Sequence, residues 1–215
     1  MITLTKVELK ALITHASKDR TRIHINSVCF DGPSGVVVAT DGHRLLARFS
    51  EPFSESVTML SVDSLKLAVN SMNLKSICHI YDGDAIRVRT GEGEPEIGFQ
   101  PCRVNAQFPP YEHVMSLPSG KDQMCGFDAK LLASTLGVLG EFFGKGQTAG
   151  MAMEFCGELE PCRISFIDDS TKATWVAVVM PCRHGLDESP AKSPVERLIK
   201  SKAPKPTKKT TGRKK

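Results

Sequence analysis

Apolar and polar residues follow one another in an order that repeats three times along the chain. Each round begins with a residue suited to a helix N-cap, at Thr5, at Ser61 or Asp63, and at Asp128, followed by apolar positions at helical spacing. Three extended stretches then follow in each round. The pattern predicts three repeats of one helix and three strands, with a period of about 60 residues. The strands are expected at 22–30, 36–40, 44–50, 77–81, 85–90, 96–104, 151–155, 162–167 and 174–180.

The first helix has the clearest start signal. Thr5-Lys6-Val7-Glu8 is a capping box, and Leu9, Leu12, Ile13 and Ala16 then recur on one helical face. Consecutive strands that pair antiparallel, with the helices packed on one face of the sheet, make an α+β architecture. We therefore predict an α+β fold with antiparallel sheets.

A hairpin is the sharpest local prediction. Val36-Val37-Val38 leads into Thr40-Asp41-Gly42-His43-Arg44-Leu45, and Asp-Gly is a strong turn signal because glycine accepts a positive φ. Asp41 and His43 are also residue types of a catalytic pair, but no serine, cysteine or metal ligand lies at a recognisable spacing from them. The sequence therefore favours a structural turn over catalysis.

The composition is that of an ordinary globular protein, with 40% hydrophobic and 24% charged residues. No apolar run approaches the ~18 residues that cross a membrane and no signal peptide is recognisable, so a cytoplasmic location without membrane contact is expected. The seven cysteines are scattered and lack a Cys-x-x-Cys motif, which favours reduced, mostly buried thiols over disulfides or zinc. No cofactor, metal site or enzyme signature is predicted.

Charge is distributed unevenly along the chain. Residues 191–215 contain ten Lys or Arg against one acid, a net +9, which leaves −5 for the first 190 residues out of an overall +4. The tail from 186 is also rich in Pro, Ser and Thr and is expected to be disordered. A flexible polycation is a candidate for nonspecific nucleic-acid contact. The residues that would make this contact are Lys205, Lys208, Lys209, Arg213, Lys214 and Lys215.

Three stretches in a fixed order point to one family. They are Thr40-Asp41-Gly42-His43-Arg44-Leu45, Phe108-Pro109-Pro110-Tyr111 with His113-Val114, and Val178-Val179-Met180-Pro181-Cys182-Arg183. In that order they resemble the middle-domain hairpin, the segment between the second and third domains, and the final strand of the bacterial DNA polymerase III beta subunit, the β sliding clamp. The resemblance covers about residues 3–183 and implies the DNA clamp, or processivity-factor, fold.

The resemblance also implies a domain organisation. Clamp chains have three domains of two repeats each, whereas this chain matches the two repeats of the middle domain and the second repeat of the last one. We therefore expect a clamp domain at 1–115, a half domain at 116–185 and the basic tail at 186–215.

The function that the resemblance implies is binding. Clamps take short peptides with apolar anchors from polymerase, clamp loader and repair proteins, and they hold duplex DNA through phosphate contacts without reading its sequence. If the helices line a ring, Lys6, Lys10, Lys66 and Lys130 would face the DNA backbone. By matching positions, the peptide pocket would be formed by Ile25, Thr40, Gly42, His43, Arg44, Leu45, Pro109, His113, Val114, Val178, Val179, Met180, Pro181, Cys182 and Arg183.

The sequence leaves the assembly open. Two copies that pair their half domains about a two-fold axis would hold three domains, so a closed ring would need four chains. The alternatives are a monomer, or a regulator without a ring that keeps the pocket and competes with or docks onto a host clamp. A reduced clamp of either kind fits a phage or plasmid protein. The tail is a further alternative partner of the pocket, because it could cover the pocket or occupy it through Val195, Leu198 and Ile199.

Overall fold

The computed structural model describes residues 1–81, 85–90, 95–115, 126–143, 150–155, 160–168 and 170–182, which form eleven strands and four helices. The helices are α1 (Lys6–His15), α2 (Val62–Ser71), α3 (Glu112–Met115) and α4 (Ala129–Gly140). The strands are β1 (Ile2–Thr5), β2 (Ser27–Asp31), β3 (Val36–Thr40), β4 (Arg44–Phe49), β5 (Val57–Ser61), β6 (Ile77–Tyr81), β7 (Ala85–Arg89), β8 (Ile97–Phe99), β9 (Ala152–Phe155), β10 (Cys162–Ile167) and β11 (Thr174–Val179).

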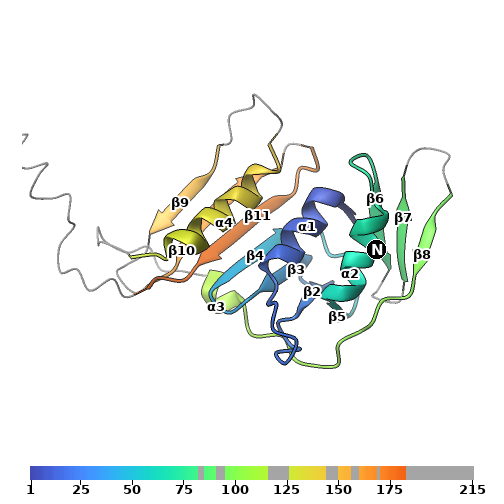
Figure 1. The fold of residues 1–215 in the computed structure, drawn as a ribbon, viewed down its shortest axis with the longest axis horizontal. Coiled ribbons are helices and arrows are strands. Elements are labelled where there is room, and N and C mark those ends of the chain that lie inside the picture. The colour runs from blue at the N-terminus through green and yellow to red at the C-terminus, as the bar shows by residue number, and fades with distance from the viewer. Residues whose placement is uncertain are drawn as a thin grey trace, which may run out of the picture. The chain divides into compact units, whose positions relative to one another are not determined.

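The strands form two antiparallel sheets. One has the order β1-β6-β7-β8, and the other has the order β5-β2-β3-β4-β11-β10-β9. In the larger sheet, β4 pairs with β11 in an antiparallel register that runs from Arg44↔Val179 to Phe49↔Thr174. Elements that are far apart in the sequence therefore lie side by side at the centre of this sheet (Figure 1).

Three repeats of one helix and three strands are present, as the sequence predicted. They are α1 with β2–β4, α2 with β6–β8, and α4 with β9–β11. Strands β3, β6 and β10 have the predicted bounds, and the helix N-caps are Thr5, Ser61 and Asp128. The α+β fold class and the repeat pattern are confirmed.

The first two repeats exchange a strand that the sequence analysis missed. β1 precedes α1 but pairs with β6 of the second repeat, and β5 precedes α2 but pairs with β2 of the first. The helix N-cap residue ends the exchanged strand in both cases, since Thr5 pairs with Ile77 and Ser61 pairs with Ser27. The first two repeats are thus interlocked through their backbones.

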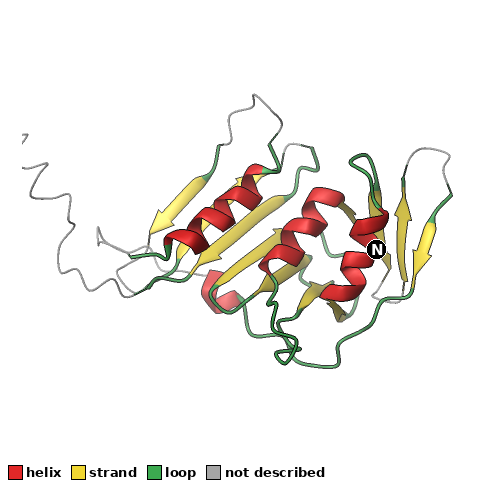
Figure 2. Ribbon diagram, viewed as in Figure 1, coloured by secondary structure: helices red, strands yellow, loops and turns green. Residues whose placement is uncertain are grey.

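Helices α1, α2 and α4 lie on the same face of the sheets (Figure 2). The main core fills the space between them and includes Leu9, Leu12, Leu65, Leu139 and the fully buried Trp175. α1 packs against α2 on one side and α4 on the other. The opposite face of the larger sheet has a smaller core, built on Val38, Ala47 and Val178 and covered by the segment at 104–115. Two layers of side chains therefore enclose the sheet where β4 meets β11.

Two predicted strands are much shorter than expected, whereas four others differ by one residue. The strand expected at 22–30 begins only at Ser27, because the chain turns at Arg22, whose carbonyl accepts hydrogen bonds from the backbone amides of Ile25 and Asn26. Ile23, which suggested alternation, is 53% exposed. The strand expected at 96–104 is limited to Ile97–Phe99. The strand ends early because the chain after Phe99 leaves the small sheet. It then pairs with β5 through Arg103 and Leu60, a contact that the local pattern does not show.

Buried thiols behave as the sequence indicated. Cys29, Cys78 and Cys162 are buried, and burial raises the pKa of Cys29 and of Cys78 to about 12. Cys102 and Cys182 are exposed. No group of His, Cys, Asp or Glu suited to a metal ion occurs among the described residues. Every helix in the described ranges falls short of what a membrane span needs in length or apolar character.

His15 is a buried titratable group at the end of α1. Its Nδ1 lies 2.9 Å from the carbonyl oxygen of Ala11, and its Nε2 has no hydrogen-bond partner among the described residues. Burial lowers the pKa of His15 from 6.5 to about 4. The neutral ring is therefore the form that the folded chain accommodates.

Acid is expected to weaken the fold through His15. The unfolded chain binds this proton near pH 6.5 and the folded chain only near pH 4, so the stability is complete above about pH 6.5 and falls as the pH drops toward 4. At pH 5 the loss is about 2 kcal/mol. His15→Asn should remove that part of the pH dependence in urea unfolding at pH 7 and pH 5. The same pH dependence in both chains would contradict the assignment.

Candidate functional site

The hairpin between β3 and β4 has the predicted structure. Gly42 has a φ of 92°, and the Asp41 carboxylate accepts hydrogen bonds from the backbone amides of His43 and Arg44, at 2.9 and 3.0 Å. The Thr40 hydroxyl accepts from the Gly42 amide at 3.0 Å and donates to the Arg44 carbonyl at 2.7 Å. These contacts engage the Asp41 carboxylate and the Thr40 hydroxyl within the turn, which supports a structural role for Asp41.

Arg44 connects this hairpin to two helices. Its Nε donates to the Asp41 carboxylate at 3.1 Å, its Nη2 donates to the carbonyl of Thr14 in α1 at 2.9 Å, and its Nη1 donates to the hydroxyl of Ser134 in α4. The residue is only 8% exposed. The guanidinium therefore joins the first repeat to the third directly behind the hairpin.

The end of β11 is fixed against the same hairpin. The Met180 amide donates to the His43 carbonyl at 2.9 Å, and the Cys182 amide donates to the Gly126 carbonyl at 2.8 Å. Val178 is buried on the face opposite the helices, whereas Met180 is 37% exposed. The chain leaving the sheet therefore presents an apolar surface beside the hairpin.

The connecting segment is anchored across the outer face of the sheet. The Val104 amide donates to the Met59 carbonyl at 2.8 Å, and the Tyr111 hydroxyl donates to the Asp31 carboxylate at 2.6 Å. Burial, followed by this hydrogen bond, raises the pKa of Tyr111. The ring of Phe108 packs edge-on against Tyr111 with centroids 6.4 Å apart. Its bonds to β5 and β2 thus hold the segment over the sheet, where Tyr111 packs against side chains of β3 and β4.

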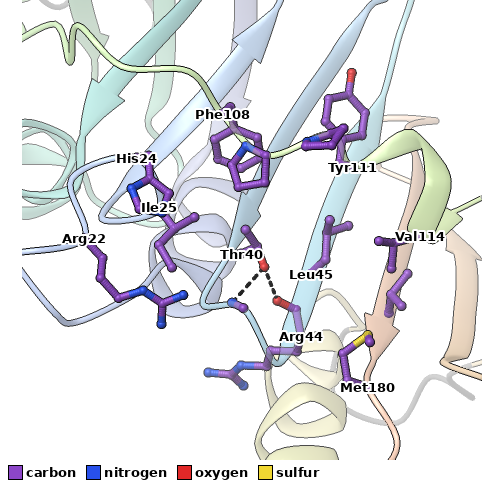
Figure 3. A pocket seen from close by; sticks show the side chains of 14 residues that line it. Arg22, His24, Ile25, Thr40, Arg44, Leu45, Phe108, Tyr111, Val114 and Met180 are labelled. Carbon is purple, nitrogen blue, oxygen red and sulfur yellow. Dashed lines mark hydrogen bonds between the residues drawn. The ribbon is translucent and has the colours of Figure 1, made fainter. Parts of the chain in front are cut away.

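A cavity of about 210 Å³ lies between these pieces, and we call it the joint cavity because it sits where β4 meets β11. Figure 3 shows Thr40 and Leu45 between Ile25 on one side and Val114 and Met180 on the other. The lining is mainly apolar, with a few polar groups. It consists of Arg22, His24, Ile25, Thr40, Gly42, Arg44, Leu45, Phe108, Pro109, Pro110, Tyr111, Val114, Val178 and Met180.

Nine of the residues predicted for the peptide pocket line the joint cavity. They come from all three predicted stretches and from the turn before β2: Ile25, Thr40, Gly42, Arg44, Leu45, Pro109, Val114, Val178 and Met180. Bringing these distant parts of the chain together requires the pairing of β4 with β11 and the anchored segment above them.

Five other predicted pocket residues do not line the cavity. Val179 is buried in the helix-side core, because successive side chains of β11 point to opposite faces. His43 is exposed at the hairpin, and His113 is exposed on α3. Pro181 and Cys182 lie beyond the end of β11. Arg183 lies outside the described residues, as do the tail lysines and arginines and the apolar group at 195–199.

Five lining residues were missed by the sequence analysis: Arg22, His24, Phe108, Pro110 and Tyr111. Arg22 and His24 were assigned to a strand, whereas they lie in a turn that faces the hairpin. A Cβ built on Gly42 would lie 3.0 Å from Nη2 of Arg22, so this glycine also leaves room for the guanidinium. The other three residues belong to the quoted 108–111 stretch, and their aromatic and proline content was the available signal.

The four lysines predicted to face DNA all lie on the helix side. Lys6 donates to the Met72 carbonyl, Lys10 pairs with Glu141 at 3.5 Å, and Lys66 pairs with Asp63 at 3.4 Å. Lys130 is exposed on the first turn of α4. Acidic neighbours therefore balance two of these charges at the surface.

Comparison with solved structures identifies the fold. A DNA polymerase III beta subunit from Thermotoga maritima matches with a TM-score of 0.59 at 19% identity, over 85% of this chain and 65% of that chain. A putative DNA polymerase III beta subunit from Eubacterium rectale matches with a TM-score of 0.60 at 13% identity, over 86% and 66%. A beta clamp from Helicobacter pylori matches with a TM-score of 0.58 at 14% identity, over 83% and 63%.

Comparison of sequences alone finds no relative of this chain. No model of a known family matches the chain, and no curated protein matches it. The chain spans about 65% of the length of the solved beta subunits. It therefore has the sliding-clamp fold of bacterial DNA polymerase III beta subunits.

Proposed function

We propose that this chain is a sliding-clamp-like processivity factor. It oligomerises around duplex DNA without reading the sequence, and it tethers DNA polymerase, clamp-loader or repair proteins through short peptides that bind the joint cavity. It acts in the cytoplasm by binding alone, without catalytic chemistry or a cofactor.

The observation that carries the proposal is the composition of the joint cavity. An apolar cavity with a few fixed polar groups suits a short peptide with apolar anchors. Leu45, Val178 and Met180 supply apolar walls, and the flexible Met180 side chain can adapt to different partners. Arg22 and His24 on the opposite side offer donors to a polar or acidic group of the peptide (Figure 3).

The number of repeats supports oligomerisation. The described residues form three repeats, whereas the clamp resemblance implies six for each full-length chain. Two copies would supply one full clamp chain's set of repeats, and four copies would supply a closed ring. The four lysines belong to α1, α2 and α4 and, with the basic tail, would contact the DNA backbone.

A peptide-binding experiment tests the cavity. A fluorescein-labelled short peptide with leucine and phenylalanine anchors should bind the native chain, and Met180→Glu should weaken binding at least tenfold in fluorescence anisotropy because a carboxylate would be desolvated against the anchors. Leu74→Glu is the matched control, since Leu74 is 86% exposed and lies outside the cavity. Equal losses in both variants, or no binding to the native chain, would reject the peptide site.

A topology experiment tests encirclement. The assembled protein should stay on a closed circular duplex and leave a linear duplex of the same sequence, because a ring slides off free ends. Peptide binding without retention on either DNA would favour the second candidate, a regulator without a ring. The observation that favours this candidate is that Glu141 and Asp63 partly neutralise Lys10 and Lys66, which reduces the positive charge available for DNA.

A further inference from the structure

We propose that the open edge of β9, with the apolar surface of the third repeat beside it, binds a second copy of this chain. The contact is isologous, so each copy presents the same strand and the same helix, α4, to the other. This inference deepens the oligomerisation part of the proposed function and rests on it, but it involves none of the joint cavity residues.

The two interlocked repeats show what the third repeat lacks. The first strand of each three-strand unit is covered on its outer side by a strand of the sister repeat: β5 covers β2, and β1 covers β6. The corresponding strand of the third repeat is β9, which pairs with β10 alone among the described residues. Figure 1 shows β9 at the end of the sheet. Within the described ranges no strand takes the corresponding place beside β9, and in an isologous contact the partner's own β9 would take it.

The exposure of side chains also distinguishes β9 from its counterparts β2 and β6. The second and fourth residues of β2 and β6 are Val28, Phe30, Cys78 and Ile80, and each is at most 2% exposed. In β9 these positions are held by Met153 and Phe155, which are 38% and 50% exposed. They pair with the buried Ile164 and Cys162 and therefore continue the apolar helix-side face of the sheet.

Helix α4 also lacks the neighbour that its counterparts have. α1 and α2 pack against each other as sister helices, whereas α4 has α1 as its main helical neighbour in the described part of the chain. Leu131, Leu132 and Leu136 of α4 are only partly buried. A two-fold partner would bring its own α4 against this surface, as α1 meets α2.

The edge also lacks the usual protection against pairing. Exposed edge strands in monomeric proteins commonly carry lysine, proline or a bulge. Ala152–Phe155 has no proline or lysine, and its single charge, Glu154, is bound by Arg163 of the neighbouring strand. A second copy is the occupant that supplies a sister repeat of the same construction, which an unrelated protein would not.

The test is the solution mass of matched variants. Light scattering of the full chain should give two or four copies, and Met153→Lys with Phe155→Lys should halve the mass by placing like charges in the contact. Met153→Lys alone should act in the same direction, and it keeps the contact between Phe155 and Phe127, whose ring centroids are 6.0 Å apart. Ile167→Lys is the control, because Ile167 is 59% exposed on the other face of the same sheet.

The outcomes separate this interface from other contacts. A native chain that stays monomeric at tens of micromolar, or an unchanged mass in folded β9 variants, overturns the proposal. Ile97→Lys changes an exposed residue of β8, the end of the other sheet, and should leave at least a dimer. A fall to monomer in that variant would instead indicate a head-to-tail contact. Peptide anisotropy on the same samples reports the joint cavity separately, so either proposal can fail without the other.

Discussion

Arg48→Ala is expected to destabilise the chain by about 3–5 kcal/mol, because it leaves a buried carboxylate without its cation. Arg48 Nε donates to Glu8 Oε1 at 2.9 Å, and Glu8 is fully buried. The other oxygen of Glu8 accepts from the Thr5 amide at 2.6 Å, which closes the capping box of α1. The pair therefore ties the start of α1 to β4, and urea unfolding at pH 7 measures its loss.

A surface pair of the same chemistry is the control. Arg89 donates to Glu96 at 2.7 Å, but its side chain is 46% exposed. Arg89→Ala should cost no more than about 1 kcal/mol, because Arg87 still lies 3.7 Å from the Glu96 carboxylate at the surface. Removing both buried partners, with Glu8→Leu and Arg48→Met, should cost less than Arg48→Ala alone. Equal costs for Arg48→Ala and Arg89→Ala would show that burial of the pair does not determine its contribution.

Local signals in the sequence were reliable guides to local structure. The capping box at Thr5, the N-cap at Asp128 and the Asp-Gly turn at Asp41 each depend on contacts within about three residues, and all three are present. The Asp128 carboxylate accepts from the amides of Leu131 and Lys130, which lowers its pKa. Such contacts can be predicted because both partners stand in the same short stretch of sequence.

The pattern of apolar and polar residues could not predict contacts between repeats. β1 and β5 are short, and their partners belong to the sister repeat, so nothing local marked them as strands. Residues of the three quoted stretches meet at the joint cavity, but alternation along β11 separates Val178 from Val179. Arg44 was expected only as a wall, and its bonds to α1 and α4 depend on a helix packing that no single stretch encodes.

Arg44→Ala should weaken both the fold and the proposed peptide site. The variant leaves the Asp41 carboxylate, the Thr14 carbonyl and the Ser134 hydroxyl without their shared donor, at an expected cost of about 3 kcal/mol in urea unfolding. Because the same guanidinium holds the hairpin against α4, the wall of the joint cavity formed by Thr40 and Leu45 should lose its fixed position. Peptide affinity should therefore fall at least tenfold in anisotropy, at a temperature where the variant is folded.

Two variants separate positioning by Arg44 from direct contact with a peptide. Arg22→Ala removes an exposed lining residue whose guanidinium makes a long 3.4 Å contact with the Asp41 carbonyl. It should change stability by less than about 0.5 kcal/mol while still reducing affinity. Ser134→Ala removes a single bond to Arg44 outside the cavity and should cost about 1 kcal/mol. Ser134 does not line the cavity, so a loss of peptide affinity in Ser134→Ala would show that the Arg44 bond between the first and third repeats determines the shape of the site. If only Arg22→Ala lowers it, the site is formed by its lining alone.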